Sequence, residues 1–448
     1  MAKLTNMTKG NIFKTILVFG LPIFLGNIFQ TLYNTIDSII VGQFVGDLAF
    51  AAVGSTNALI NLLVGLFMGI SSGAGVLISR YYGANKIIEV KDTIHTFISI
   101  SIIGGIILSI IGVISSKSLL ILFNTPDDIL YLATIYLQIY FIGGLSLVLY
   151  NCGASILRAI GDSKTPLYLL ILSSTINVIL DLVFVLYFDM GVIGVGIATL
   201  IAQSSSAILV MIILICHKEV CKVNIKDITI NKRYFIEIIN IGIPSGIQQS
   251  IISLSNVFVQ SYVNGFGNYV IAGYSAANKI DSYIMISINS LAISLTTYVG
   301  QNAGANDYQR VFKGINISIL SMFILLIVIC SICYINIDSL ISLFNNNPNV
   351  IYYGSLKMKY LLPFYFILGI GQLLGSALRG LGRVKIPMYT NILSFCIIRQ
   401  LYLFVFLKLN YDISIIFNSY ALTWFISTLI LLVYYFKGPW RYKLSNIR

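Results

Sequence analysis

Residues 157–166 read LRAIGDSKTP, and residues 378–387 read LRGLGRVKIP. The two segments are 221 positions apart (378 less 157), and each connects two long apolar runs. The same offset relates two further pairs, LLILFN at 119–124 with LISLFN at 340–345 and GAN at 83–85 with GAN at 304–306. Chance similarity between apolar segments would not keep one offset across several polar motifs. The sequence therefore predicts two tandem copies of one fold.

The composition indicates a membrane protein. Of the 448 residues, 57% are hydrophobic and 10% are charged, whereas soluble chains carry about 45–50% and about 25%. A soluble core cannot absorb this excess of apolar surface, but lipid can. The net charge of +12 does not indicate nucleic-acid binding, because the basic residues form no single patch. They are spread over short segments between apolar runs.

The apolar runs predict α-helical spans. A bilayer core needs about 20 mostly apolar residues per helix, and the runs are continuously apolar rather than alternating, which excludes a barrel. We expect an all-α integral membrane protein with twelve transmembrane helices at 13–39, 48–75, 94–116, 130–155, 165–188, 192–216, 235–262, 270–298, 314–335, 352–378, 386–408 and 412–436.

The distribution of Lys and Arg predicts the orientation. With a cytoplasmic N-terminus, 22 of the 28 basic residues fall in cytoplasmic segments, and Lys279 and Arg399 fall within spans. The four on the outer side are Lys117, Lys357, Lys359 and Lys408. Cytoplasmic loops carry the excess of basic residues. We therefore expect a multi-pass protein of the plasma (inner) membrane of a prokaryote, with both termini in the cytoplasm.

Six spans in each copy determine how the copies are related. An even number lets both enter the membrane from the same side, so a pseudo-twofold axis runs along the membrane normal. We expect an N-lobe at 1–216, a basic cytoplasmic linker at 217–233 and a C-lobe at 234–448. Two such six-helix bundles facing each other would enclose a central cleft.

Polar side chains form one stripe on the first span. The stripe consists of Asn27, Gln30, Tyr33, Asn34 and Asp37, at helical spacing. A lipid-facing stripe could not be this polar, so it faces either a wet cavity or a structural polar seam against another helix. Pro22 precedes the stripe and removes a backbone hydrogen bond, which predicts a hinge.

The fifth predicted span carries a second carboxylate. Ser174, Asn177 and Asp181 lie at i, i+3 and i+7 on one face. Together with Asp37, Asp181 could supply oxygens to a hard cation or share a proton; alternatively, Asp181 is solvated near a helix end. Lys279 and Asp281 point to different faces of the eighth span, and we expect them to be structural. Arg399 has no partner that the sequence reveals.

Several functions are excluded by missing motifs. No G-x-x-x-x-G-K-[ST] segment is present, so there is no ATP site of that type. The only histidines, His95 and His217, belong to no metal or catalytic-triad pattern. We therefore expect no enzyme, no cofactor and no ATP use. An ion gradient, which the intramembrane carboxylates favour, or a partner ATPase would drive transport.

These residues resemble the multidrug and toxic compound extrusion (MATE) family over nearly the full length. The features that carry the resemblance are Leu21-Pro22, Gln30, Tyr33, Asp37 and Val41-Gly42, then Asn177 and Asp181, then 194–199, and finally 300–305, GQNAGA. The resemblance implies a V-shaped pair of lobes that exports drug-like, often cationic compounds in exchange for Na⁺ or H⁺.

The resemblance also implies site residues. A cation site, for Na⁺ or a proton, would consist of Asp37, Asn177, Asp181 and Thr199. A substrate cavity would include Gln30, Tyr33, Asn34, Asp37, Asn151 and Ser174. The chain lacks the acidic residues of the seventh and tenth spans that characterise the NorM-type branch, so it is nearer the DinF-like branch, with coupling in the N-lobe. We expect a monomer in contact with membrane lipid.

Three rival classes are less favoured, because each requires a feature that the sequence does not show. A flippase or exporter of a lipid-linked or other endogenous metabolite would need a cavity rich in Arg and Lys. A major-facilitator transporter would carry the loop signature G-x-x-x-D-[RK]-x-G-[RK] after its second span. Residues 83–92, which follow the second span here, read GANKIIEVKD and lack this signature. An intramembrane enzyme would need a clustered nucleophile and base or a metal set. The sequence does not distinguish Na⁺ from H⁺ coupling, nor identify the exported compound.

Overall fold

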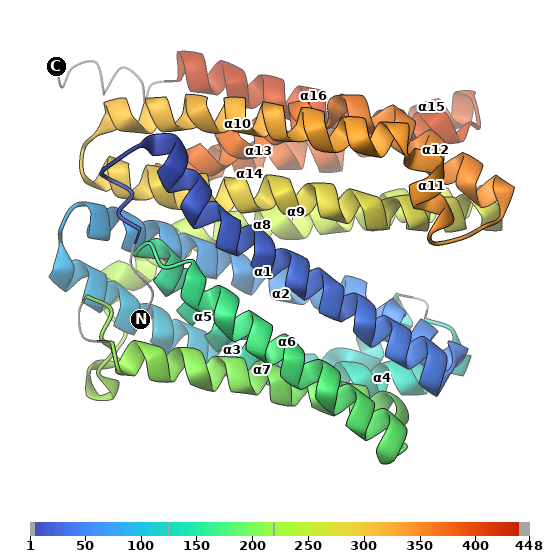
Figure 1. Cartoon of the computed structure of the whole chain (residues 1–448), viewed down its shortest axis with the longest axis horizontal. Helices are drawn as coiled ribbons and strands as arrows, with labels where there is room; N and C mark the ends of the chain where they lie inside the picture. Colours follow the sequence, from blue (N-terminus) through green and yellow to red (C-terminus); the bar gives the residue numbers. More distant parts are fainter. Residues whose placement is uncertain (1–4, 124, 218–219, 439–448) are drawn as a thin grey trace. The chain divides into compact units, whose positions relative to one another are not determined.

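The computed structural model describes residues 5–123, 125–217 and 220–438, and every regular element within them is a helix (Figure 1). The first half contains α1 (Ile12–Ile40), η1 (Val41–Val45), α2 (Asp47–Gly83), α3 (Ile87–Leu122), α4 (Asp127–Ile142), α5 (Gly144–Ala159), α6 (Lys164–Leu182), η2 (Val183–Tyr187) and α7 (Gly191–Ile215).

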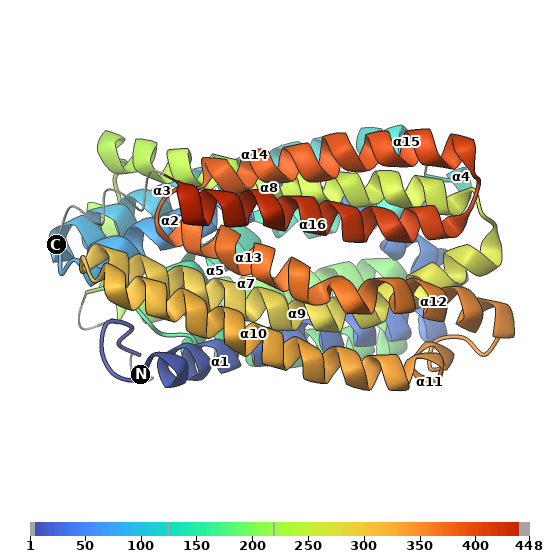
Figure 2. The same ribbon diagram turned by 90° about the horizontal axis from the view of Figure 1, so that it is seen from above.

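The second half repeats this series after the short η3 (Ile225–Asp227). It contains α8 (Lys232–Asn264), α9 (Asn268–Gly304), α10 (Tyr308–Ile335), α11 (Ile337–Ser342), α12 (Pro348–Leu361), η4 (Leu362–Phe364), α13 (Tyr365–Gly380), α14 (Lys385–Asn391), η5 (Ile392–Ile398), α15 (Arg399–Leu409) and α16 (Ile413–Lys437). Figure 2 shows α14, η5 and α15 as one continuous rod beside α16.

Each of the twelve predicted spans coincides with one helix or with one run of helical elements. Among the described residues, ten of these are long and apolar enough to cross a membrane, and α4 with α5, bent by 47°, makes an eleventh. The twelfth, α8, is less apolar because it carries a series of amides and hydroxyls. Its 33 residues still extend about 50 Å. The all-α membrane fold is confirmed.

The chain divides into two compact units. The described part of the first unit comprises residues 5–6 and 21–246, and that of the second comprises 7–20 and 247–438, with the gaps given above. Each unit thus includes the beginning of the other half's first helix, and the changeovers lie next to Pro22 and Pro244. The lobe limits at 216 and 234 remain predictions, and residues 218–219 of the linker lie outside the described part.

Segments of π-helix interrupt three of the long helices. η1 follows Asp37 by four residues, η2 follows Asp181 by two, and η5 ends directly before Arg399. A π-helical turn widens the helix and occurs mostly at functional sites. All three segments therefore lie beside the ionisable residues that the sequence singles out.

One face of α1 is apolar and exposed. Its members recur every three or four residues: Phe13, Leu17, Leu21, Leu25, Phe29, Leu32, Ile36 and Ile39. The polar stripe with Asn27, Gln30, Tyr33 and Asp37 lies on a different side of the same helix. Because the exposed side is continuously apolar, it suits lipid, and the polar side must face elsewhere.

In the first unit, α2 and α8 come into direct backbone contact through glycines. A Cβ atom added to Gly69 would lie 2.1 Å from the Cα of Gly246, and one added to Gly73 would lie 2.5 Å from the amide nitrogen of Gly242. The glycines are four residues apart on each helix, the spacing that permits close helix crossing in membranes.

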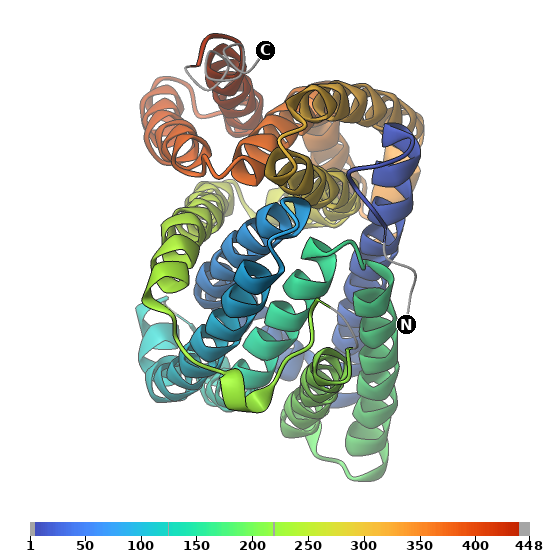
Figure 3. The same ribbon diagram turned by 90° about the vertical axis from the view of Figure 1, so that its left-hand side faces the viewer.

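The segment before α8 is held by side chains of α3. The backbone N–H of Asn224 donates to Nε2 of His95 at 3.3 Å, and that of Asn231 donates to Oγ1 of Thr96 at 3.2 Å. This segment crosses the end of the helices in Figure 3. These contacts hold the basic linker against α3 within the first unit.

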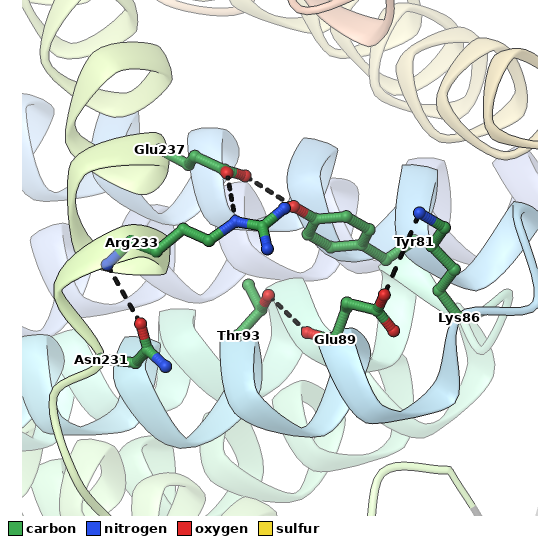
Figure 4. Close-up of polar contacts among 7 residues, drawn as sticks. All are labelled: Tyr81, Lys86, Glu89, Thr93, Asn231, Arg233 and Glu237. Atoms are coloured by element: carbon green, nitrogen blue, oxygen red, sulfur yellow. Dashed lines mark hydrogen bonds and ion pairs between the residues drawn. The ribbon is translucent and has the colours of Figure 1, made fainter.

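The first turns of α8 are attached to α2 by a polar cluster (Figure 4). The hydroxyl of Tyr81 donates to Oε2 of Glu237 at 2.7 Å, and Nε of Arg233 donates to Oε1 of the same carboxylate at 3.3 Å. Glu237 therefore anchors the beginning of α8, close to the glycine crossing.

Candidate functional site

The carboxyl groups of Asp37 and Asp181 meet inside the first unit. Asp37 lies near the end of α1 and Asp181 near the end of α6, and the two carboxyl groups are close enough to interact electrostatically. Asp181 is fully buried, so a solvated position near a helix end is excluded. Two neighbouring carboxyl groups disfavour two free negative charges, so a shared proton or a bound cation would stabilise the pair.

The predicted face of α6 points into the protein. Ser174, Asn177 and Asp181 are 8%, 1% and 0% exposed, whereas Thr175 and Ile179 on other faces are exposed. Thr199, 6% exposed, lies on α7, which packs along α6 (Figure 1). The helical spacing thus places the predicted oxygens of α6 on one buried face, next to the helix that carries Thr199.

These oxygens have no hydrogen-bond partner within the described part of the chain. The buried atoms without one are Oδ1 of Asp37, Oγ of Ser174, both amide atoms of Asn177, both carboxyl oxygens of Asp181 and Oγ1 of Thr199. Leaving a buried polar atom unpaired costs about 1–3 kcal/mol. These unpaired atoms on α6, α7 and Asp37 are groups with which a cation or a proton would pair.

The donor set fits a hard monovalent cation better than a transition metal. Carboxylate, amide and hydroxyl oxygens are hard ligands. The described residues contain no group of three or more His, Cys, Asp or Glu side chains arranged for a metal ion. The residues Asp37, Asn177, Asp181 and Thr199 therefore fit Na⁺ or a shared proton, and both possibilities stay open.

The predicted substrate-cavity residues of α1 lie on the same stripe of the helix as Asp37. Gln30 and Asn34 are exposed, and Gln30 is hydrogen-bonded to Tyr33, which interacts electrostatically with Asp37. Asn151, the cavity residue predicted on α5, already uses part of its side chain within its own helix. Its Nδ2 donates to the carbonyl of Leu147 at 2.9 Å. Its carbonyl oxygen and its second amide N–H are left to meet a substrate.

Three residues of the site escaped the sequence reading. Tyr136 of α4 is buried and interacts electrostatically with both Asp37 and Asp181. Tyr140, one turn further along α4, is hydrogen-bonded to Gln203 of α7, whose Oε1 is buried without a partner among the described residues. The i, i+4 pair of tyrosines in an apolar span was a usable signal, but many spans of this chain carry tyrosine.

Pro22 lies beside a hollow of about 290 Å³ in the first unit. The hollow is also lined by Asn27, Tyr150 and Arg158. It does not include the carboxyl pair, but Asn27 is one turn from Gln30 and Tyr150 is next to Asn151. α1 remains helical through Pro22, so the hinge stays a prediction.

The remaining ionisable residues of the spans lie in the second unit. Lys279 is exposed, whereas the Asp281 carboxylate accepts a hydrogen bond from Tyr365, so the two point to different faces as predicted. Lys357 was assigned to an outer segment, but it lies within α12, 1% exposed, and donates to Asn278. That assignment was wrong, because burial along a helix cannot be read from charge alone. Arg399 is also buried.

The fold and the site define a class: a duplicated, all-α, multi-span membrane transporter with a buried acidic pair in its first half. A protein-family model described as MatE matches the chain twice, over residues 22–183 and 244–405. The chain belongs to the MatE family of multidrug efflux transporters, as the resemblance predicted. The two matches begin 222 residues apart (244 less 22), which confirms the duplication.

Curated relatives and solved structures agree with this assignment. "Probable multidrug resistance protein YoeA" of Bacillus subtilis is 28% identical, covering 86% of this chain and 85% of YoeA. "Probable multidrug resistance protein YpnP" of the same organism is 27% identical, covering 98% of each. A structure described as the outward-facing conformation of a multidrug resistance MATE family transporter has a TM-score of 0.90 at 20% identity, covering 100% and 99%. The structural likeness shows the fold alone.

Proposed function

We propose that this chain is a secondary antiporter that exports drug-like, often cationic and amphipathic, small molecules in exchange for Na⁺ or H⁺ by alternating access. The observation that carries the proposal is the pair Asp37–Asp181 with its unpaired oxygens. Intramembrane carboxylates are expensive to keep and mark ion or proton pathways. The names of the curated relatives, which refer to multidrug resistance, support the substrate class.

In the proposed cycle, the coupling ion and the cationic substrate both depend on the negative charge of the Asp37–Asp181 pair. A cation or proton arriving from outside neutralises the pair, which weakens the attraction for a cationic substrate and releases it. Because the coupling between two ligands is reciprocal, bound substrate must weaken ion binding by the same factor. The energy of the gradient thereby drives export without ATP.

The proposal is tested with purified protein in proteoliposomes. Efflux of a fluorescent organic cation is measured while a Na⁺ gradient and a pH gradient are imposed separately. We expect one of the two gradients to drive efflux and an equal osmotic gradient of K⁺ not to do so. Efflux that responds to none of these gradients would contradict secondary antiport.

The alternative, export or flipping of a lipid-linked or other endogenous metabolite, is less favoured by the first unit. Its buried site presents carboxylates, and a phosphate-bearing lipid would require cations there. Transport of a fluorescent lipid diphosphate, with no efflux of organic cations in the same vesicles, would support this alternative instead.

We further propose that both termini face the cytoplasm, on the strength of the basic residues between the spans. Cys216 follows α7 and is exposed, so a membrane-impermeant maleimide should label it in inverted vesicles and not in right-side-out vesicles. The Cys216→Ser variant serves as the control, because it retains the other five cysteines. The reverse labelling pattern would overturn the orientation.

A further inference from the structure

Arg399 lies fully buried in the second unit, 1% exposed, and no sequence feature explains it. Its Nη2 donates to Oγ1 of Thr423 at 2.8 Å, and its Nη1 donates to Oγ of Ser255 at 3.3 Å and to Oδ1 of Asn256 at 3.4 Å. These acceptors are neutral side-chain oxygens of α8 and α16. The guanidinium therefore fills a cage of oxygens that come from separate helices.

Two aromatic rings cover the guanidinium. Its Cζ lies 4.6 Å from the ring centroid of Phe395 and 4.5 Å from that of Tyr420, within the range of cation–π attraction. No carboxylate balances the charge within 4 Å, since the two ion pairs found in the described residues, Lys86–Glu89 and Arg233–Glu237, lie elsewhere. Oxygens and rings, not an anion, hold this cation.

The duplication shows what this cage corresponds to. An offset of 221 relates Thr199 to Tyr420 and Ser174 to Phe395. An offset of 222 relates Tyr33 to Ser255 and Asn34 to Asn256. The elements around Arg399, namely α8, η5 with α15, and α16, repeat α1, α6 and α7. Those three first-half helices carry the candidate cation site.

The two halves therefore differ in how the buried polar oxygens of equivalent helices are paired. In the first unit, oxygens of α1, α6 and α7 are buried without a donor. In the second unit, the same three helices hold a cation that is covalently attached to the chain, one residue after Ile398, the counterpart of Asn177, and that donates to the local oxygens. We infer that Arg399 is a built-in cation that occupies the second-half counterpart of the cation site, so that only the first half exchanges an ion with the solvent.

A second buried cation supports this inference. Nζ of Lys357 lies 4.0 Å from the ring centroid of Tyr274, whose hydroxyl is 2.6 Å from the hydroxyl of Tyr420, the ring that covers Arg399. Asp281, which is hydrogen-bonded to Tyr365, is the carboxylate of this region. With Lys357 and Arg399 both in place beside one carboxylate, this region has no net negative charge that would attract a further free cation.

The inference rests on the proposed function of the first-half site, and its test separates the two. Purified Arg399→Ala protein is titrated with guanidinium chloride at millimolar concentrations, far below those that unfold proteins, and its thermal unfolding midpoint is compared with that in equal NaCl. We expect the variant to unfold at a lower temperature and guanidinium to restore the midpoint saturably. The original chain should show no such response.

Two further variants show whether rescue by guanidinium is specific to the Arg399 cage. Arg379→Ala removes another buried guanidinium of the second unit, which is bonded to Gln248 and Ser376, and we expect no saturable rescue there. The rescue should persist in the double variant Asp37→Asn/Arg399→Ala, because it does not depend on the first-half site. Equal rescue of the Arg379 and Arg399 variants, or none at all, would overturn the inference without affecting the proposed antiport.

If Arg399→Ala does not fold, two other variants test whether the cage needs a positive charge. Arg399→Lys retains the charge in the cage, whereas Arg399→Gln retains polarity and loses it. We expect the lysine variant to keep export and most of its thermal stability, and the glutamine variant to lose both. A glutamine variant equal to the original chain in both respects would show that the cage needs no cation.

Discussion

Replacing Asp37 by asparagine is expected to reduce gradient-driven efflux to the level of vesicles without protein. The asparagine side chain has nearly the same size and keeps one oxygen, but it can neither ionise nor share a proton with Asp181. An arriving ion or proton would then have only Asp181 to neutralise, and the paired site would be lost. Efflux of an organic cation from proteoliposomes, at matched protein content, measures the effect.

The control for this prediction is Asp47→Asn. Asp47 is an exposed carboxylate in the first turn of α2, ten residues from Asp37, and its replacement should leave efflux close to normal. Both variants should reach the membrane in similar amounts. Normal gradient-driven efflux by the Asp37 variant would remove Asp37 from the coupling mechanism.

Replacing Gly69 by leucine is expected to disrupt folding of the first unit. The new Cβ would lie 2.1 Å from the backbone of Gly246 on α8, and backbone atoms cannot rotate away as a side chain can. The two helices must separate, which loses their packing. Overpacking usually costs about 1–3 kcal/mol, and a clash between two backbones belongs at the upper end. The thermal unfolding midpoint and the yield of monodisperse protein in detergent report the change.

The matched control is Gly54→Leu in the same helix. A Cβ at Gly54 would meet no atom within 4 Å, so this variant undergoes the same chemical change in open space. We expect its unfolding midpoint to stay near that of the original chain. If the Gly69 and Gly54 variants unfold at the same temperature, the close crossing of α2 and α8 does not contribute to stability.

The different polarity of the two halves bears on how transport is organised. The first unit places the half-buried Asp37 beside the buried Asp181, whereas the second buries Lys357 and Arg399 near the half-buried Asp281. Duplication supplied the same helices twice, and substitutions changed the charge of the equivalent sites. With an exchangeable ion in one half only, the charge of the second half would stay constant through the cycle.

The sequence by itself determined the class of fold. Spans, repeat and membrane character follow from local hydrophobicity and from one constant offset, and neither depends on how distant segments meet. The polar stripes of α1 and α6 were also visible, because side-chain direction in a helix follows from its period. Asp37, Asn177, Asp181 and Thr199 could therefore be named from sequence together with the family resemblance.

Only the tertiary structure decided which of these groups meet and what surrounds them. Asp37 and Asp181 are separated by 144 residues (181 less 37), and no local pattern reports that their carboxyl groups interact. The burial of Lys357, the contribution of Tyr136 and the oxygen cage of Arg399 likewise depend on packing between helices far apart in the chain. Hydrophobicity acts residue by residue, whereas the environment of a buried charge is set by whichever side chains the packed helices bring within a few ångströms of it.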